Sequence, residues 1–128
     1  MKHIFFLLCL LCVTTVSAMA QDAVKVDPKH YTVEFENDQV RVLRIRYGPH
    51  EKSVMHKHPA GVAIFLTDSN TRFTSPNGKI EERPGKAGQV LAAAADTHLP
   101  ENLSDQPFEA IMVELKAEQA KSRQNKKR

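Results

Sequence analysis

The stretch SVMHKHPAGVAIFL, residues 53–66, places two histidines, His56 and His58, immediately before an apolar run. Residues two apart on a strand point to the same face and lie about 7 Å apart along the chain. Two neutral imidazoles on one face can converge on one metal ion, and imidazole suits zinc, copper, iron and nickel. A pair of surface histidines on an edge strand is the alternative that these residues leave open.

The sequence around this stretch consists of short strand-like segments separated by turn residues. Tyr31–Glu36 and Val40–Tyr47 flank a turn at residues 37–38, and a slip in the alternation at Val42-Leu43 predicts a β-bulge. Further strands are expected at residues 54–58, 62–66, 71–75, 80–83, 89–93, 97–99 and Phe108–Leu115, with turns or breaks at 48–49, 59–61, 67–70, 76–79 and 84–88. This pattern indicates an all-β antiparallel sandwich or barrel.

The first twenty residues have the three-part pattern of a secretory signal peptide. Lys2 and His3 precede the apolar run 4–13, and residues 18–20 have the A-x-A spacing that a signal peptidase recognises. The apolar run is too short to span a bilayer, so no stable membrane anchor is expected. We therefore expect cleavage after Ala20 and a secreted or periplasmic protein.

The composition of residues 21–128 limits the classes of protein to which they can belong. Both cysteines, Cys9 and Cys12, lie in the leader, which excludes a disulfide framework, a cysteine nucleophile and a cysteine zinc site from the mature chain. The length suffices for one core, expected at residues 21–116. Residues 117–128 form a basic tail, expected to be frayed or a short helix. The tail contains no aromatic residue that could stack on bases, so nucleic-acid binding is not expected.

A third histidine, His98, lies forty residues after His58. Several strand and turn units intervene, enough to return the chain to the same region of a closed barrel. A loop histidine bonded to backbone is the alternative reading of His98. Of the remaining histidines, His50 follows a Gly-Pro break and is a candidate for the rim of the site, while His30 lies in the N-terminal segment. The predicted metal ligands are His56, His58 and His98.

Residues 33–116 resemble the cupin superfamily of small jelly-roll barrels. The first cupin motif pairs H-x-H with a glutamate that follows after three or four intervening residues. His56 and His58 match the histidines, but Val62 and Ala63 occupy the positions of the glutamate. The resemblance therefore implies a ligand set of three histidines without the usual carboxylate.

The second cupin motif runs from a glycine through P-x-G to a histidine and then to an asparagine. Gly88 opens the corresponding segment, Ala94 and Asp96 replace the proline and the second glycine, and His98 is followed four residues later by Asn102. The resemblance implies a small antiparallel jelly-roll (cupin) barrel with a short charged C-terminal tail.

The missing glutamate changes the chemistry that the resemblance implies. A site of three neutral histidines leaves the metal its full charge and keeps coordination positions open for water or substrate. The ion expected there is divalent: iron, zinc, manganese or nickel. Glu101 is a candidate either to replace the missing carboxylate or to accept a hydrogen bond from a ligand imidazole.

Two classes of function follow from these residues. The first is a metal-dependent enzyme of the oxygenase or isomerase type that acts on a small molecule, with no assigned general base. The second is a non-catalytic barrel that binds a small ligand or is structural, with a lapsed metal site. A nucleophilic hydrolase is disfavoured, because the mature chain has no cysteine and no G-x-S-x-G turn. An exposed barrel sheet could also pair two copies into a homodimer.

Overall fold

The computed structural model describes residues 20–116. Its elements are β1 (Gln21–Asp22), α1 (Ala23–Val26), β2 (Tyr31–Glu36), β3 (Val40–Tyr47), β4 (His56–His58), β5 (Gly61–Phe65), β6 (Ser69–Thr74), β7 (Ile80–Gly85), β8 (Val90–Ala93), β9 (Asp96–Asn102) and β10 (Phe108–Leu115). The fold is all-β, as the sequence predicted, and also contains a single turn of helix in this part of the chain. The expected leader and basic tail lie almost entirely outside the described residues.

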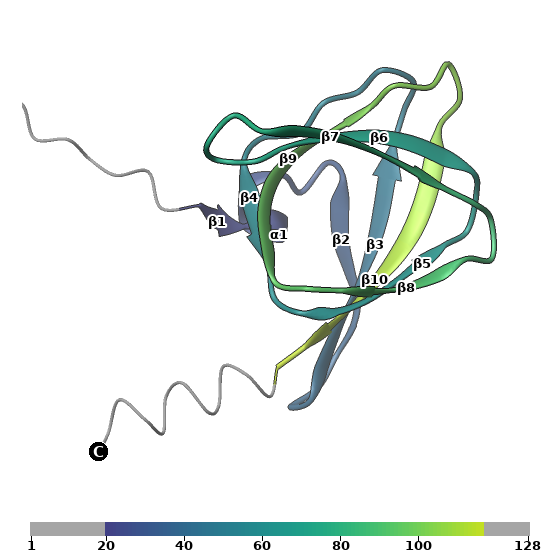
Figure 1. The fold of residues 1–128 in the computed structure, drawn as a ribbon. Coiled ribbons are helices and arrows are strands. Elements are labelled where there is room, and N and C mark those ends of the chain that lie inside the picture. Colours follow the sequence, from purple (N-terminus) through teal and green to yellow (C-terminus); the bar gives the residue numbers. More distant parts are fainter. Residues whose placement is uncertain (1–19, 117–128) are drawn as a thin grey trace, which may run out of the picture.

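Two five-stranded sheets face each other and enclose the interior (Figure 1). One sheet has the strand order β1-β4-β9-β6-β7, and the other has the order β2-β3-β10-β5-β8. All pairs are antiparallel except β1 with β4. The crossing order of strands distant in sequence is that of a jelly roll. The first sheet brings β4 and β9, which carry the predicted ligands, side by side.

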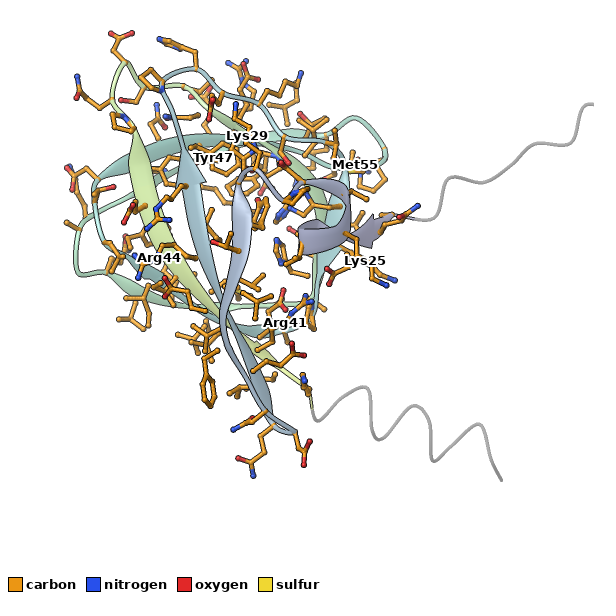
Figure 2. The ribbon with its side chains drawn as sticks, turned by 180° about the vertical axis from the view of Figure 1, so that it is seen from behind. Lys25, Lys29, Arg41, Arg44, Tyr47 and Met55 are labelled. Carbon is orange, nitrogen blue, oxygen red and sulfur yellow. The ribbon has the colours of Figure 1, made fainter. Side chains whose placement is uncertain are left out.

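The second sheet supplies most of the core. Along β3 and β10 alternate residues point inward, as the pleat of a strand requires. Leu43 and Tyr47 from β3 pack with Phe108 and Met112 from β10, and all four are buried. Burial of each such side chain stabilises the fold by about 2 kcal/mol. The alternation also separates the arginines of β3: Arg41 points inward, whereas Arg44 and Arg46 bind Glu109 on the outer face (Figure 2).

The predicted bulge lies where expected, but the extra residue is on the partner strand. Val33 pairs with Leu43 and Phe35 pairs with Val42, so the unpaired residue is Glu34 of β2. The slip in the alternation of β3 correctly located the irregularity. It could not identify the bulged strand, because a bulge is a property of the pair.

Several predicted boundaries were wrong by a few residues. The strand expected at 54–58 is shorter, the turn expected at 67–70 ends where β6 begins at Ser69, β7 continues to Gly85 through a predicted break, and β9 extends over Asp96–Asn102. Pairing explains the longer strands, because β6 and β9 continue wherever a neighbour supplies hydrogen bonds.

The N-terminal segment contains structure that the sequence did not predict. Gln21 and Asp22 pair with His56 and Lys57 as a parallel strand, and the Asp22 carboxylate then accepts the Val24 backbone N–H at 3.1 Å as the cap of α1. Among residues 20–116, no helix has the length and apolarity needed to span a membrane.

Candidate metal centre

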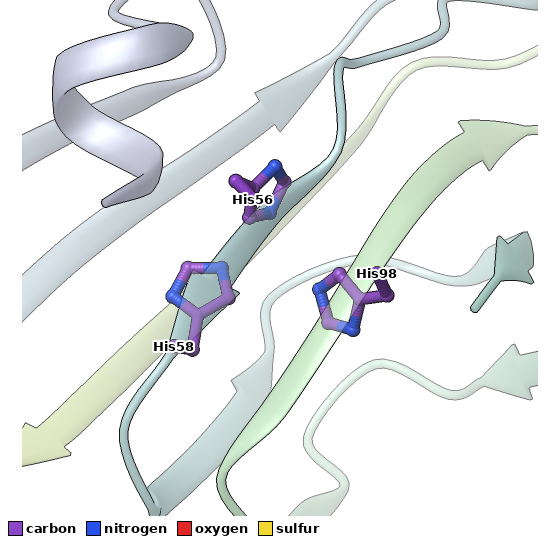
Figure 3. A group of neighbouring side chains, drawn as sticks. All are labelled: His56, His58 and His98. Carbon is purple, nitrogen blue, oxygen red and sulfur yellow. The ribbon is translucent and has the colours of Figure 1, made fainter. Parts of the chain in front are cut away.

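The three predicted ligands converge at one place inside the barrel (Figure 3). His56 and His58 project from β4, and antiparallel pairing sets His56 directly opposite His98 on β9. One nitrogen of each ring lies within 4.8 Å of the corresponding nitrogens of the other two. Small side-chain rotations would bring three nitrogens at this spacing onto one ion at bond lengths of about 2.0–2.1 Å.

Hydrogen bonds fix the tautomer of each ring. Nδ1 of His56 donates to the Val54 carbonyl at 2.8 Å, Nδ1 of His58 faces a Glu114 carboxylate oxygen at 2.7 Å, and Nδ1 of His98 faces an Asp96 carboxylate oxygen at 2.9 Å. Carbonyls and carboxylates only accept hydrogen bonds, so each Nδ1 carries the proton. Nε2 of every neutral ring is therefore left with its lone pair, which is the donor a metal requires.

The surroundings of His56 and His98 favour their neutral forms. His56 is completely buried, and burial, together with the neighbouring His58 and His98, lowers its pKa to about 4. Burial also lowers the pKa of His98, although its bond to Asp96 acts in the opposite direction. Nε2 of His56 is buried and has no hydrogen-bond partner among the described residues. An unsatisfied buried nitrogen is costly, and a metal ion would satisfy it. The residues present therefore fit a metal ion.

Glu114, on β10 of the opposite sheet, forms a hydrogen bond with Nδ1 of His58. Its side chain is about 2% exposed, and its two oxygens have different partners. Oε1 accepts from His58 at 2.7 Å, while Oε2 accepts from Nε of Arg41 at 2.6 Å. Arg41 also binds the carboxylate of Asp22. Sequence reasoning missed this group because it lies far from both cupin motifs.

The position of Glu114 follows from the inward face of β10. In the strand Phe108–Leu115 the even-numbered positions face inward, and Phe108 and Met112 are buried. Glu114 continues the same series, but the odd-numbered positions from 111 to 115 are apolar too, so the sequence alone does not show which series faces inward. A buried carboxylate needs a partner, and such a position marks a functional or ion-paired site.

No model of a known protein family matches the sequence, and no curated protein matches it. Solved structures do match. A cupin domain from Bordetella pertussis Tohama I has 23% sequence identity and a TM-score of 0.62, covering 66% of this chain and 90% of that chain. An RmlC-like cupin with a double-stranded β-helix fold from Methanocaldococcus jannaschii has 17% identity and a TM-score of 0.52, covering 70% and 83%. The chain has the cupin fold.

A third similar structure, a protein with a double-stranded β-helix domain from Klebsiella pneumoniae, has 21% identity and a TM-score of 0.52, covering 65% of this chain and 72% of that chain. Identities this low establish the fold and carry no activity with them. The chemistry of this cupin barrel must therefore be derived from its own residues.

The carboxylate missing from the first cupin motif is not replaced by Glu101. Glu101 lies three residues after His98 on β9 and so faces the other side of the strand. Its nearest ionic partner is Arg72, at 3.8 Å. The hydrogen-bonding role suggested for Glu101 belongs instead to Glu114 and Asp96, which bind the rings of His58 and His98.

The remaining histidines of the described chain lie outside the cluster. His50 is in a turn with φ +56° and pairs with Asp105 at 2.6 Å, so the expected role at the rim is not supported. His30 is buried between two carboxylates, with Asp27 2.7 Å from Nδ1 and Glu51 2.9 Å from Nε2. Asn102, the last residue of the second motif, is completely buried and binds backbone groups of the adjoining loops.

A cavity of about 440 Å³ opens beside the histidines inside the cupin barrel. Its apolar wall includes Ile45, Phe65, Phe73, Leu91 and Met112. Polar residues on its wall include His58, His98, Thr71 and the Arg83–Asp96 pair. The space has the size that small ligands occupy.

Proposed function

We propose that this protein binds a divalent transition-metal ion through Nε2 of His56, His58 and His98, and that the adjoining cavity receives a small molecule. The observation that carries the proposal is the buried, unpartnered Nε2 of His56, which faces two further rings with the same tautomer. Neutral imidazole is the ligand form that metal binding requires, and lowered histidine pKa values keep it available.

The cavity supports a ligand with an apolar body and a polar end. Aromatic and aliphatic side chains line most of the wall, while His58 and His98 lie on its polar side. A bound divalent ion would supply Lewis-acid or redox chemistry at that polar side.

A second candidate is a barrel that binds a small ligand without transforming it. Asp96 is the one acidic residue on the described cavity wall, and it is already bound to His98, with Arg83 3.9 Å away. Among the described residues the cavity therefore offers no free carboxylate as a general base. This observation favours binding, or metal chemistry that needs no protein base.

Metal content tests the proposal directly. Untagged protein, purified without chelator, is analysed by elemental mass spectrometry beside a His56→Ala/His98→Ala variant. The matched control is His50→Ala, which removes an exposed histidine outside the cluster. We expect near-stoichiometric metal in the native and control proteins and its loss from the double variant. Absence of metal from the native protein, even after incubation with iron, zinc, manganese and nickel salts, would contradict the proposal.

We also propose that the chain is exported and that its leader is removed after Ala20. The support is the three-part leader pattern of residues 1–20. Amino-terminal sequencing of protein recovered from a bacterial periplasm tests this. An N-terminus at Gln21 is the expected result, and an intact leader on soluble cytoplasmic protein is the opposing one.

A further inference from the structure

A chain of charged side chains, half-buried at Asp22 and Arg41 and buried at Glu114, connects the N-terminal segment to one of the histidines. Asp22 on β1 binds Arg41 on β3, Arg41 donates to Glu114 on β10 at 2.6 Å, and Glu114 accepts from His58 on β4 at 2.7 Å. Four strands from both sheets thus meet through side chains. Neither cupin motif contains Asp22, Arg41 or Glu114.

We propose that Glu114 is the positioning residue of the metal site, held in place by Arg41 and Asp22, and that it fixes the tautomer and orientation of His58. The inference rests on the proposed function, because it assigns Glu114 a role toward the metal that the three histidines would bind.

The geometry makes Glu114 a partner of a ligand rather than a ligand. Oε1 is engaged by His58 and Oε2 by Arg41, so neither oxygen is free to turn toward the other two rings. A carboxylate behind a histidine orients the ring and raises its basicity toward the metal. Glu114 therefore supplies a negative charge near the site. Unlike the glutamate that the first motif lacks, it acts through His58 and not as a metal ligand.

The charges of this group suit both the metal-free and the metal-bound site. A buried carboxylate without a partner is strongly destabilising, so Arg41 is needed when no metal is bound. Asp22, Arg41 and Glu114 together carry a net charge of −1. A divalent ion held by three neutral histidines keeps its full +2 charge in a poorly solvated interior, and the nearby net anion partly offsets it.

The strand beside Glu114 approaches β10 unusually closely at one residue. Gly61 of β5 pairs with Glu114 in the ladder, and a Cβ atom at Gly61 would lie 2.0 Å from the Val113 carbonyl oxygen and 3.1 Å from Cα of Glu114. Only glycine permits this approach of β5 to β10. Gly61 is the first residue of β5 and follows His58, the last residue of β4, by three residues. The close contact with β10 therefore fixes where the chain begins its next strand after His58.

A purely structural role predicts different results from a positioning role. An ion pair that only closes the barrel would change stability when removed and leave the metal environment unaltered. A positioning residue changes the affinity of the site and the spectrum of the bound ion. Removing such a carboxylate typically lowers metal affinity about 10–100-fold.

The test compares Glu114→Gln with Glu109→Gln as a matched control on the same strand. Glu109 also binds arginines of β3, but on the outer face. We measure Zn²⁺ affinity by competition with a chromophoric chelator and the visible absorption spectrum of the Co²⁺-loaded protein. We expect Glu114→Gln to lower Zn²⁺ affinity about 10–100-fold and to shift the Co²⁺ bands, Asp22→Asn to act in the same direction by a smaller factor, and Glu109→Gln to change neither.

A measurement on the native protein tests the inference even if the Glu114→Gln variant fails to fold. Nitrogen-15 NMR of the metal-free native protein at about pH 8 reports which nitrogen of His58 carries the proton, above the ordinary imidazole pKa. A proton on Nδ1 supports the inference, and a proton on Nε2 overturns it. Native Zn²⁺ affinity and native Co²⁺ bands in Glu114→Gln would overturn it as well. A native protein with no metal affinity contradicts the proposed function instead, while the NMR result still decides the role of Glu114.

Discussion

Acid should destabilise the metal-free protein through His56. The pKa of His56 is about 4 in the folded chain and 6.5 in the unfolded chain, because burial and the two neighbouring histidines oppose its protonation. Between these values the unfolded state binds more protons, so this contribution to stability is complete above about pH 6.5 and is lost as the pH falls to about 4. A shift of about 2.5 units, at roughly 1.4 kcal/mol per unit, amounts to about 3 kcal/mol.

Urea denaturation of chelator-treated protein across this pH range measures the effect. The variant His56→Asn keeps a donor for the Val54 carbonyl but cannot titrate, so it should lose about 3 kcal/mol less stability than the native protein between pH 7 and pH 4. His98, whose pKa is also lowered, contributes equally to both proteins and cancels in the difference. The control His50→Asn removes an exposed histidine and should follow the native profile. Parallel profiles for the native and His56→Asn proteins would refute the reasoning.

Three further substitutions test how the barrel supports the site. Gly61→Ala should lower the free energy of unfolding by about 3 kcal/mol in urea denaturation, because its Cβ would lie 2.0 Å from a backbone oxygen. The control Gly48→Ala should cost far less, because its Cβ would meet a flexible side chain at 3.1 Å. Asn102→Ala should lower the free energy of unfolding by about 3 kcal/mol, because it leaves buried backbone groups unpaired. The folded variant should still bind stoichiometric metal, and loss of metal would contradict a purely structural role for Asn102. Tyr31→Phe removes a 2.8 Å bond between buried tyrosine hydroxyls and should lower the thermal midpoint, with a cost of about 1–3 kcal/mol; an unchanged midpoint would show that the bond contributes nothing.

The strands were predictable where local pattern and tertiary pairing agree. Phe108–Leu115 is rich in apolar and β-branched residues and has hydrogen-bonded neighbours on both sides, and its predicted bounds are those of β10. By contrast, residues 97–99 carried a weak local signal, but β9 extends from Asp96 to Asn102 because β4 and β6 supply partners along it. The N-terminal strand β1 has only two residues, too few for any periodicity to reveal.

The candidate site was also predictable only in part from the sequence. His56 and His58 share a face because strand geometry is local, and His98 could be added because it stands where the second cupin motif has its histidine. Glu101 was the natural candidate for the carboxylate because it is close in sequence, but its position on β9 turns it away from the rings. Glu114, which does bind a ligand ring, is 56 residues from His58 along the chain.

The sequence by itself determined the all-β class, the three histidines and the lack of a carboxylate in the first motif, since alternation, residue chemistry and motif spacing are properties of short segments. Only the tertiary structure decided which nitrogen of each imidazole is free, which carboxylates stand behind the rings and that a cavity opens beside them. These features depend on hydrogen bonds and packing between strands far apart in the chain. Their geometry is set when the two sheets close on each other.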